Sequence, residues 1–178
     1  MKLINKLTDA DFNGGKRTYL NKVSRFASRG ILFDKDFNVA MIHMSRNGCY
    51  KLPGGGIEKN ETRRDAFLRE IREETGYSAK VIDELGYIEE HKLRNKFMQR
   101  SYCYVAKAGL HKSNIMLSNN EKKLGFEVAW MPLDEALIAM KNSLEICNEY
   151  TMNFMLLRDK LIVEEAKKWL KRTNNNIK

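Results

Sequence analysis

A run of three glycines at residues 54–56 leads directly into a strongly helical stretch, and this pairing constrains the fold most. Asn60 or Thr62 can cap the start of that helix, and Gly76 stands where a left-handed residue commonly ends one. Glycines let a backbone approach a ligand closely, with amides facing a phosphate or carbonyls facing a metal ion. The segment 54–77 therefore predicts a glycine loop fused to an amphipathic helix.

Three glutamates gather on one face of this expected helix. At ~100° per residue, Glu73 and Glu74 lie on either side of Glu70 within two turns. Like charges at these spacings repel unless a cation neutralises them, and Mg²⁺ or Mn²⁺ prefers such oxygen ligands. An alternative stays open at this point, because paired glutamates are also typical of a solvated helix face, with Arg69 and Glu73 forming a surface ion pair.

The glycines and the helix together resemble the signature of the Nudix (MutT-like) hydrolases, G-x5-E-x7-R-E-U-x-E-E-x-G-U, where U is a bulky apolar residue. The matching residues are Gly55, Glu61, Arg69, Glu70, Ile71, Glu73, Glu74, Gly76 and Tyr77. Tyr77 is aromatic where an aliphatic residue is more usual, which bears on packing and not on chemistry. The resemblance covers residues 25–142, and we call the segment 55–77 the box.

The resemblance implies roles for individual residues. Glu70, Glu73 and Glu74, with a backbone carbonyl of Gly55, are the expected ligands of Mg²⁺ or alternatively Mn²⁺. Arg69 would orient these carboxylates, and Glu70, Glu73 and Arg69 would form the catalytic group. A later glutamate serves as general base in some members, and Glu121 and Glu127 are the candidates here, although each also suits an exposed loop acid.

Substrate recognition is less specified. Gly54, Gly55, Gly56, Arg29 and Lys51 are the expected phosphate-binding residues. Further basic or aromatic residues flank the predicted cleft and are candidates for binding phosphate or stacking on a base: Arg25, Tyr50, Lys92, Arg94, Lys96 and Arg100. The proline that ADP-ribose enzymes carry after the box is missing, because the only prolines are Pro53 and Pro132.

The order of elements favours an α/β (α+β) fold, and the resemblance implies the Nudix α/β/α sandwich with a mixed sheet between helices. Strands are expected at 25–33, 38–44, 49–52, 98–106 and 126–131, and another within 77–91. We expect an N-terminal extension over 1–24, a Nudix hydrolase domain over 25–145, and a C-terminal helix within 146–178 packed on the same domain. Apolar residues recurring at three- and four-residue steps predict that helix.

Composition narrows the functional classes. The 178 residues carry a net charge of +9, which indicates a polyanionic partner. The box region 54–77 contains six acids and five bases, so the rest of the chain carries +10. The three cysteines are far apart and form no CxxC, which argues against a zinc ribbon and favours a reducing cytoplasm. Neither a secretory signal nor a membrane span is expected.

The leading hypothesis is Mg²⁺-dependent hydrolysis of a diphosphate bond in a nucleoside diphosphate linked to another moiety, with nucleoside triphosphates included. An RNA 5′-end pyrophosphohydrolase is the first alternative, which the basic charge would suit. A non-catalytic Nudix-fold nucleotide-binding regulator is the second alternative, and such proteins are expected to lose box carboxylates that this chain keeps. The C-terminal helix offers a surface for a homodimer, although an apolar stripe more often packs into a core.

Overall fold

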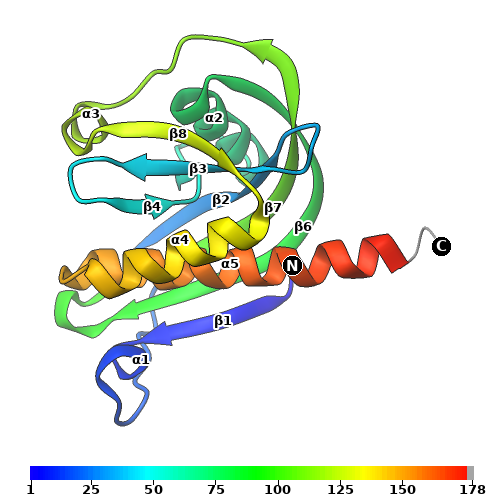
Figure 1. Cartoon of the computed structure of the whole chain (residues 1–178). Helices are drawn as coiled ribbons and strands as arrows, with labels where there is room; N and C mark the ends of the chain where they lie inside the picture. Colours follow the sequence, from blue (N-terminus) through cyan, green and yellow to red (C-terminus); the bar gives the residue numbers. More distant parts are fainter. Residues whose placement is uncertain (176–178) are drawn as a thin grey trace.

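The computed structural model describes residues 1–175 and shows one mixed sheet with helices on both faces (Figure 1). The strands are β1 (Leu3–Thr8), β2 (Arg25–Phe33), β3 (Val39–Met44), β4 (Cys49–Lys51), β5 (Gly54–Gly56), β6 (Tyr77–Lys92), β7 (Phe97–Lys112) and β8 (Phe126–Met131). The helices are α1 (Ala10–Asn13), α2 (Arg63–Thr75), α3 (Asn119–Leu124), α4 (Leu133–Ile146) and α5 (Tyr150–Asn175), with a 3₁₀ turn at Leu93–Asn95.

The sheet runs in the order β1-β6-β7-β2-β3-β4, with β5 also paired to β2 and β8 to β3. The β1–β6 and β7–β2 pairs are parallel, whereas β2 pairs with both β3 and β5 in the antiparallel sense. The whole of β2 pairs residue by residue with the first part of β7, from Arg25 opposite Gln99 to Phe33 opposite Lys107. The glycine strand β5 pairs with β2 at Ala27–Arg29, which places it beside the middle of the sheet.

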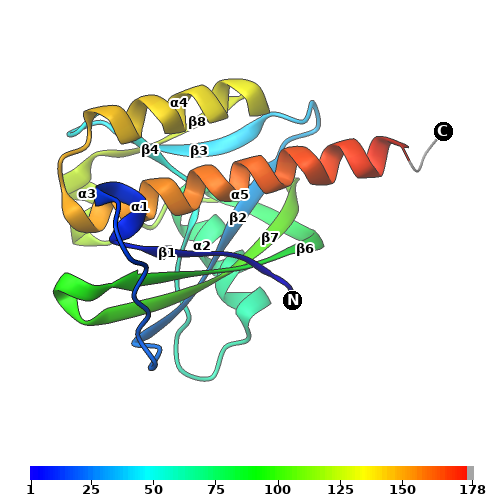
Figure 2. The same cartoon turned by 90° about the horizontal axis from the view of Figure 1, so that it is seen from below.

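Helices cover the two faces of the sheet separately (Figure 2). On one face, α2 packs fully buried Phe67 and Ile71 into a cluster with Leu32 and Tyr104 of the sheet. On the other face, α4 and α5 pack against a larger core, to which α5 contributes buried Phe154. The predicted fold class, a mixed sheet between helices, is confirmed.

The structure differs from the expected elements in three places. The glycines form the short strand β5 and not a loop, because β2 offers it a free edge at Ala27–Arg29. Helix α3 was not expected; it begins at a capping box in which Ser118 and Glu121 bond each other's backbone amides. The segment 1–24, expected only as an N-terminal extension, contains the edge strand β1 and the short helix α1. The expected C-terminal segment includes residues 176–178, which lie outside the described part of the chain.

No helix within residues 1–175 combines the length and the apolar character needed to cross a membrane.

Candidate active site

Helix α2 is held at both ends, which fixes the direction of its glutamates. The Thr62 hydroxyl caps its start by accepting the amide of Asp65 at 3.1 Å. Gly76 ends it in the left-handed conformation, with φ of 77°. Because Phe67 and Ile71 are buried against the sheet, Glu70 and Glu74 are directed toward the glycine strand β5.

Arg69 lies at the centre of the carboxylates. Its guanidinium donates to both oxygens of Glu61 at 3.1 and 2.9 Å, and to Glu70 and Glu73 at 2.9 Å each. It also donates to the carbonyl of Gly56 at 2.9 Å, so the same side chain ties α2 to β5. The hydrogen bonds that Arg69 donates to Glu61, followed by those to Glu70 and Glu73, raise the pKa of Arg69. The i,i+4 pair with Glu73 is therefore one arm of a network and not an isolated surface pair.

Glu70 is packed directly against the backbone of the glycine strand. A Cβ atom at Gly55 would lie 2.3 Å from Oε1 of Glu70, so only glycine leaves room for the carboxylate there. The side chain is 9% exposed. Burial raises the pKa of Glu70, and the charge of Arg69 opposes this shift.

Glu74 is more deeply buried and is bound on both oxygens. Lys51 donates from Nζ to Oε1 at 2.5 Å, and the amide of Gly54 donates to Oε2 at 2.8 Å. Burial raises the pKa of Glu74, and the Lys51 ammonium opposes the shift. Gly54 has φ of 139°, and a Cβ atom there would lie 2.3 Å from Cβ of Arg29. The ammonium group of Lys51 thus neutralises the charge of Glu74.

A cavity of about 330 Å³ lies beside Glu74 and the glycine strand, whereas Gly56, Arg69, Glu70 and Glu73 are not among its lining residues. We call the residues on its box side, Lys51, Gly54, Gly55 and Glu74, the box wall. The cavity also reaches Arg25, Arg29 and Lys92 among the basic residues singled out from the sequence, and Glu121 of α3. Glu127, the other candidate base, is exposed on β8 and is not among the lining residues. Arg94, Lys96, Arg100 and Tyr50 are likewise absent from the described lining.

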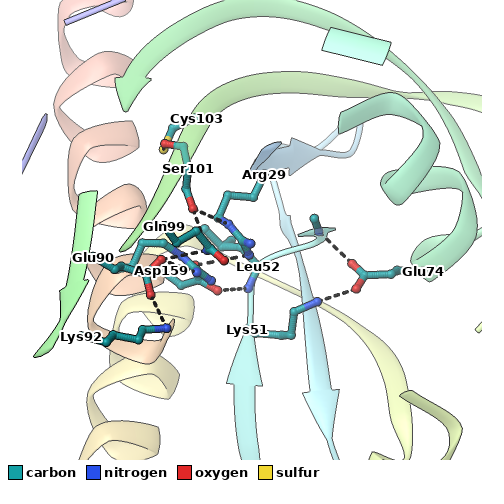
Figure 3. Close-up of polar contacts among 12 residues, drawn as sticks. Arg29, Lys51, Leu52, Glu74, Glu90, Lys92, Gln99, Ser101, Cys103 and Asp159 are labelled. Atoms are coloured by element: carbon teal, nitrogen blue, oxygen red, sulfur yellow. Dashed lines mark hydrogen bonds and ion pairs between the residues drawn. The ribbon is translucent and has the colours of Figure 1, made fainter. Parts of the chain in front are cut away.

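The opposite side of the cavity is built by β2, β6, β7 and α5. Arg29, Lys92, Gln99 and Arg158 line it, and we call this set the inner wall. Figure 3 shows Arg29, Lys92 and Gln99 of this set near the buried carboxylates of Glu90 and Asp159, across from Lys51 and Glu74. Each of its members is at most 7% exposed. Gln99 and Arg158 escaped the sequence reasoning, and no motif marks them.

Asp159 connects Arg158 of the inner wall to the backbone that leads into the glycine strand. Its Oδ2 accepts the amide of Leu52 at 2.9 Å, two residues before the glycine strand. Its Oδ1 accepts Nε of Arg158 at 2.8 Å and lies 4.0 Å from Nη1 of Arg29. The carboxylate is fully buried. Helix α5 thereby fixes the backbone that enters the box.

Glu90 gathers the charges of the inner wall. Arg158 donates from Nη1 to its Oε2 at 2.9 Å, Gln99 donates to the same oxygen at 2.9 Å, and Nζ of Lys92 lies 3.1 Å from Oε1. Burial alone would raise the pKa of Glu90, but Arg158, Lys92 and Arg29 together lower it to about 2. Glu90 is therefore a carboxylate at neutral pH.

The donor set of the box suits a hard divalent cation, because it offers carboxylate and backbone carbonyl oxygens beside a cavity. The tight seat of Glu70 on Gly55 brings a carboxylate next to the backbone of the glycine strand. In residues 1–175 no group of three or more His, Cys, Asp or Glu side chains is already arranged around one metal position. Glu70 and Glu73 are bound by Arg69, and Glu74 is bound by Lys51. A metal ion would exchange with these cations.

Comparison with protein families decides the assignment. The model of the NUDIX domain matches residues 24–148, which is more than half of the chain. The chain belongs to the Nudix family. Helix α5, which supplies Arg158 to the cavity and Asp159 to the buried network beside it, lies beyond the matched residues.

Individual relatives match over shorter stretches. An ADP-ribose pyrophosphatase of Methanocaldococcus jannaschii is 43% identical over 58 residues, which are 31% of this chain and 34% of the relative. An RNA pyrophosphohydrolase of Erythrobacter litoralis is 40% identical over 47 residues, 26% of this chain and 29% of the relative. The chain thus spans about a third of the length of these relatives.

Solved Nudix structures share the fold. A NUDIX hydrolase of Nitrosomonas europaea superposes with a TM-score of 0.57 at 17% identity, covering 78% of this chain and 88% of that one. An ADP-ribose pyrophosphatase of Streptococcus suis gives a TM-score of 0.51 at 14% identity, with coverages of 80% and 91%. At these identities the likeness concerns the fold alone.

Proposed function

We propose that this Nudix protein hydrolyses a diphosphate bond in a nucleoside diphosphate linked to another moiety, nucleoside triphosphates included. The observation that carries the proposal is the box wall: Glu74 and the glycine strand border a cavity that several basic side chains also line. Glu70 and Glu73 are held nearby through Arg69. The relative named as an ADP-ribose pyrophosphatase supports cleavage of a phosphoric anhydride.

Nudix hydrolases generally use a divalent metal ion, and we propose Mg²⁺ here, with Mn²⁺ as an alternative. Glu70, Glu73, Glu74 and the carbonyl of Gly55 would hold it. When bound, the ion neutralises the anionic oxygens of the diphosphate and lowers the pKa of a water molecule.

The chain's own residues supply orientation and charge. Arg69 holds Glu70 and Glu73 in place with charge-assisted hydrogen bonds. Lys51 and Arg29 line the cavity as cations that bind phosphate oxygens, as do the amides of the glycine strand. Of the two candidate bases, Glu121 has the better position, because it lines the cavity and Glu127 does not.

One comparison favours the RNA alternative: the match to a protein named RNA pyrophosphohydrolase, together with the net charge of +9. A panel of substrates separates the candidates. It contains ADP-ribose, UDP-glucose, ATP, dGTP and a 5′-triphosphate RNA, each incubated with Mg²⁺ or Mn²⁺. Turnover confined to the RNA would replace the leading proposal with the alternative. Binding without any turnover would favour the nucleotide-binding regulator.

The setting proposed for this activity is the cytoplasm. The three cysteines are unpaired, as a reducing compartment favours. A homodimer remains a prediction, and much of the apolar stripe of α5, including Phe154 and Val163, is buried in the protein's own core.

A further inference from the structure

The inner wall holds more cationic charge than its own carboxylates balance. Arg29, Lys92 and Arg158 contact two fully buried carboxylates, Glu90 and Asp159, so these buried groups alone carry one excess positive charge. An unbalanced buried charge is costly unless a ligand or partner compensates it. This excess lies inside the cavity that also contains the box wall.

The acidic residues at the rim of the cavity are already engaged. Glu121 accepts the amide of Ser118 at 2.7 Å, at the start of α3. Glu149 accepts the amides of Thr151 and Met152 at 3.0 and 2.5 Å, at the start of α5. Glu74 is paired with Lys51 on the box wall. Glu121 therefore serves local structure and Glu74 serves the box, whereas Glu149 also interacts electrostatically with Lys92 of the inner wall.

Arg158 has one hydrogen-bond donor group that is not used. Its Nε binds Asp159 and its Nη1 binds Glu90, but its Nη2 is buried and has no hydrogen-bond partner in the described part of the chain. The other cations of the inner wall also offer only donors. Among residues 1–175, Oε1 of Glu90 is a buried acceptor without a hydrogen bond in the same cluster, but it does not bond Nη2 of Arg158, which calls for another acceptor with negative charge. A phosphate or carboxylate group has that chemistry, and a planar guanidinium is well suited to bind it.

The remaining lining suits the organic part of the same molecule. Met44, Met152, Met155 and Phe126 contribute apolar surface to the cavity. Methionine side chains adapt to irregular shapes, and the phenylalanine ring offers a flat contact. A ligand with an anionic end and a less polar middle would therefore match the inner wall and its surroundings.

We propose that the inner wall, with Arg158 at its centre, is an anion subsite that binds a phosphate or carboxylate group of the substrate other than the diphosphate that is cleaved. The proposal deepens and rests on the proposed function, because the subsite shares its cavity with the box wall. It names a substrate class: nucleoside diphosphate derivatives whose far end is acidic, and nucleotides with an additional phosphate. It also gives α5 a role in specificity.

Calorimetric titration in EDTA tests the subsite without any hydrolysis. Inorganic phosphate and malonate are titrated separately into the wild type, into Arg158→Lys and into Lys167→Gln. Arg158→Lys keeps the charge that faces Glu90 and Asp159 but loses the guanidinium fork. Lys167→Gln removes one charge from an exposed part of the same helix and is the matched control.

We expect the wild type and Lys167→Gln to bind one anion equally and Arg158→Lys to bind it about tenfold more weakly. Tighter binding of phosphate identifies a phosphate subsite, and tighter binding of malonate a carboxylate subsite; both orders support the proposal. Equal binding by the wild type and Arg158→Lys would overturn it, as would no binding to the wild type.

If Arg158→Lys does not fold, a measurement on the wild type alone still tests the subsite. The ¹⁵N signals of the Arg158 guanidinium should shift on addition of phosphate, and unmoved signals would overturn the proposal. The readout is independent of catalysis. Anion binding that depends on Arg158 in a protein inert toward every nucleotide would refute the proposed function but keep the subsite. Turnover of a nucleotide without anion binding would refute the subsite but keep the proposed function.

Discussion

The two walls of the cavity are both charged, but they are built in different ways. The box wall and its support come from one stretch of the chain, in which α2 follows the glycine strand directly. The inner wall takes Arg29 from β2, Lys92 and Gln99 from β6 and β7, and Arg158 from α5. Glu70 and Glu73 are paired with the partly buried Arg69, whereas Glu74, Glu90 and Asp159 lie in buried ion pairs. We infer that one wall performs the chemistry and the other selects the substrate and secures the fold.

Substitution of a box glutamate should have the largest effect of all the variants considered, and that effect should be on catalysis. Glu70→Gln removes the charge of a proposed metal ligand while keeping its shape, so activity should fall at least about a hundredfold. Stability should change little, because the amide oxygen of glutamine can still accept the hydrogen bond from Arg69. Initial rates beside thermal melts check both points. Glu164→Gln, on α5 in an i,i+4 pair with Lys160, is the control and should retain full activity.

The opposite pattern is expected at the inner wall. Asp159→Ala leaves the amide of Leu52 and the guanidinium of Arg158 without their buried acceptor. Loss of one partner from a buried pair should lower the free energy of unfolding by about 3–5 kcal/mol. Urea denaturation measures it. Asp134→Asn, in an exposed pair with Lys167, should cost less than about 1 kcal/mol. Equal costs for the two variants would contradict the role given to Asp159.

The choice between Glu121 and Glu127 as the general base can be tested separately. Glu121 lines the cavity and Glu127 does not, so Glu121→Gln should lower kcat by about a hundredfold and Glu127→Gln should leave it unchanged. Steady-state kinetics with the substrate found in the panel provide the measurement. A large loss in Glu127→Gln alone would assign the base to β8.

A smaller effect should appear in the dependence of stability on pH. The pKa of Glu90 is lowered to about 2 from an ordinary value of 4.5, so its folded form stays charged in acid. Its contribution to stability is complete above about pH 4.5 and is lost as the pH falls toward 2. Glu90→Gln should flatten this part of the stability curve, and exposed Glu84→Gln should not. Identical curves for the two variants would show that the inner wall does not hold Glu90 as described.

The box could be predicted from the sequence because its parts are local. A capping threonine, a terminal glycine and glutamates at helical spacing lie within one short segment, and α2 begins and ends as they indicate. The strand β5 was missed because its pairing depends on the distant β2. The location of Glu121 likewise depends on α3, a short helix whose capping box only the structure brings to the cavity.

The inner wall could not be predicted for a related reason. Arg158 lies far from Glu90 and Gln99 in the sequence, and each of the three would suit a solvent-exposed surface of a strand or helix. An Arg-Asp pair inside an amphipathic helix is usually solvated, but here α5 turns Arg158 and Asp159 toward the sheet. These charges are buried because α5 packs on the sheet. Apolar periodicity predicts the helix, but it does not predict that Arg158 and Asp159 are buried.

The central claim is that the box glutamates catalyse a metal-dependent cleavage of a diphosphate bond. The most direct measurement is product release from the substrate panel by the wild type and by Glu70→Gln, with Mg²⁺ and with EDTA. The account predicts that the wild type turns over at least one nucleoside diphosphate derivative with Mg²⁺ and none with EDTA, and that Glu70→Gln is nearly inactive. Full activity in Glu70→Gln, or in the presence of EDTA, would contradict it.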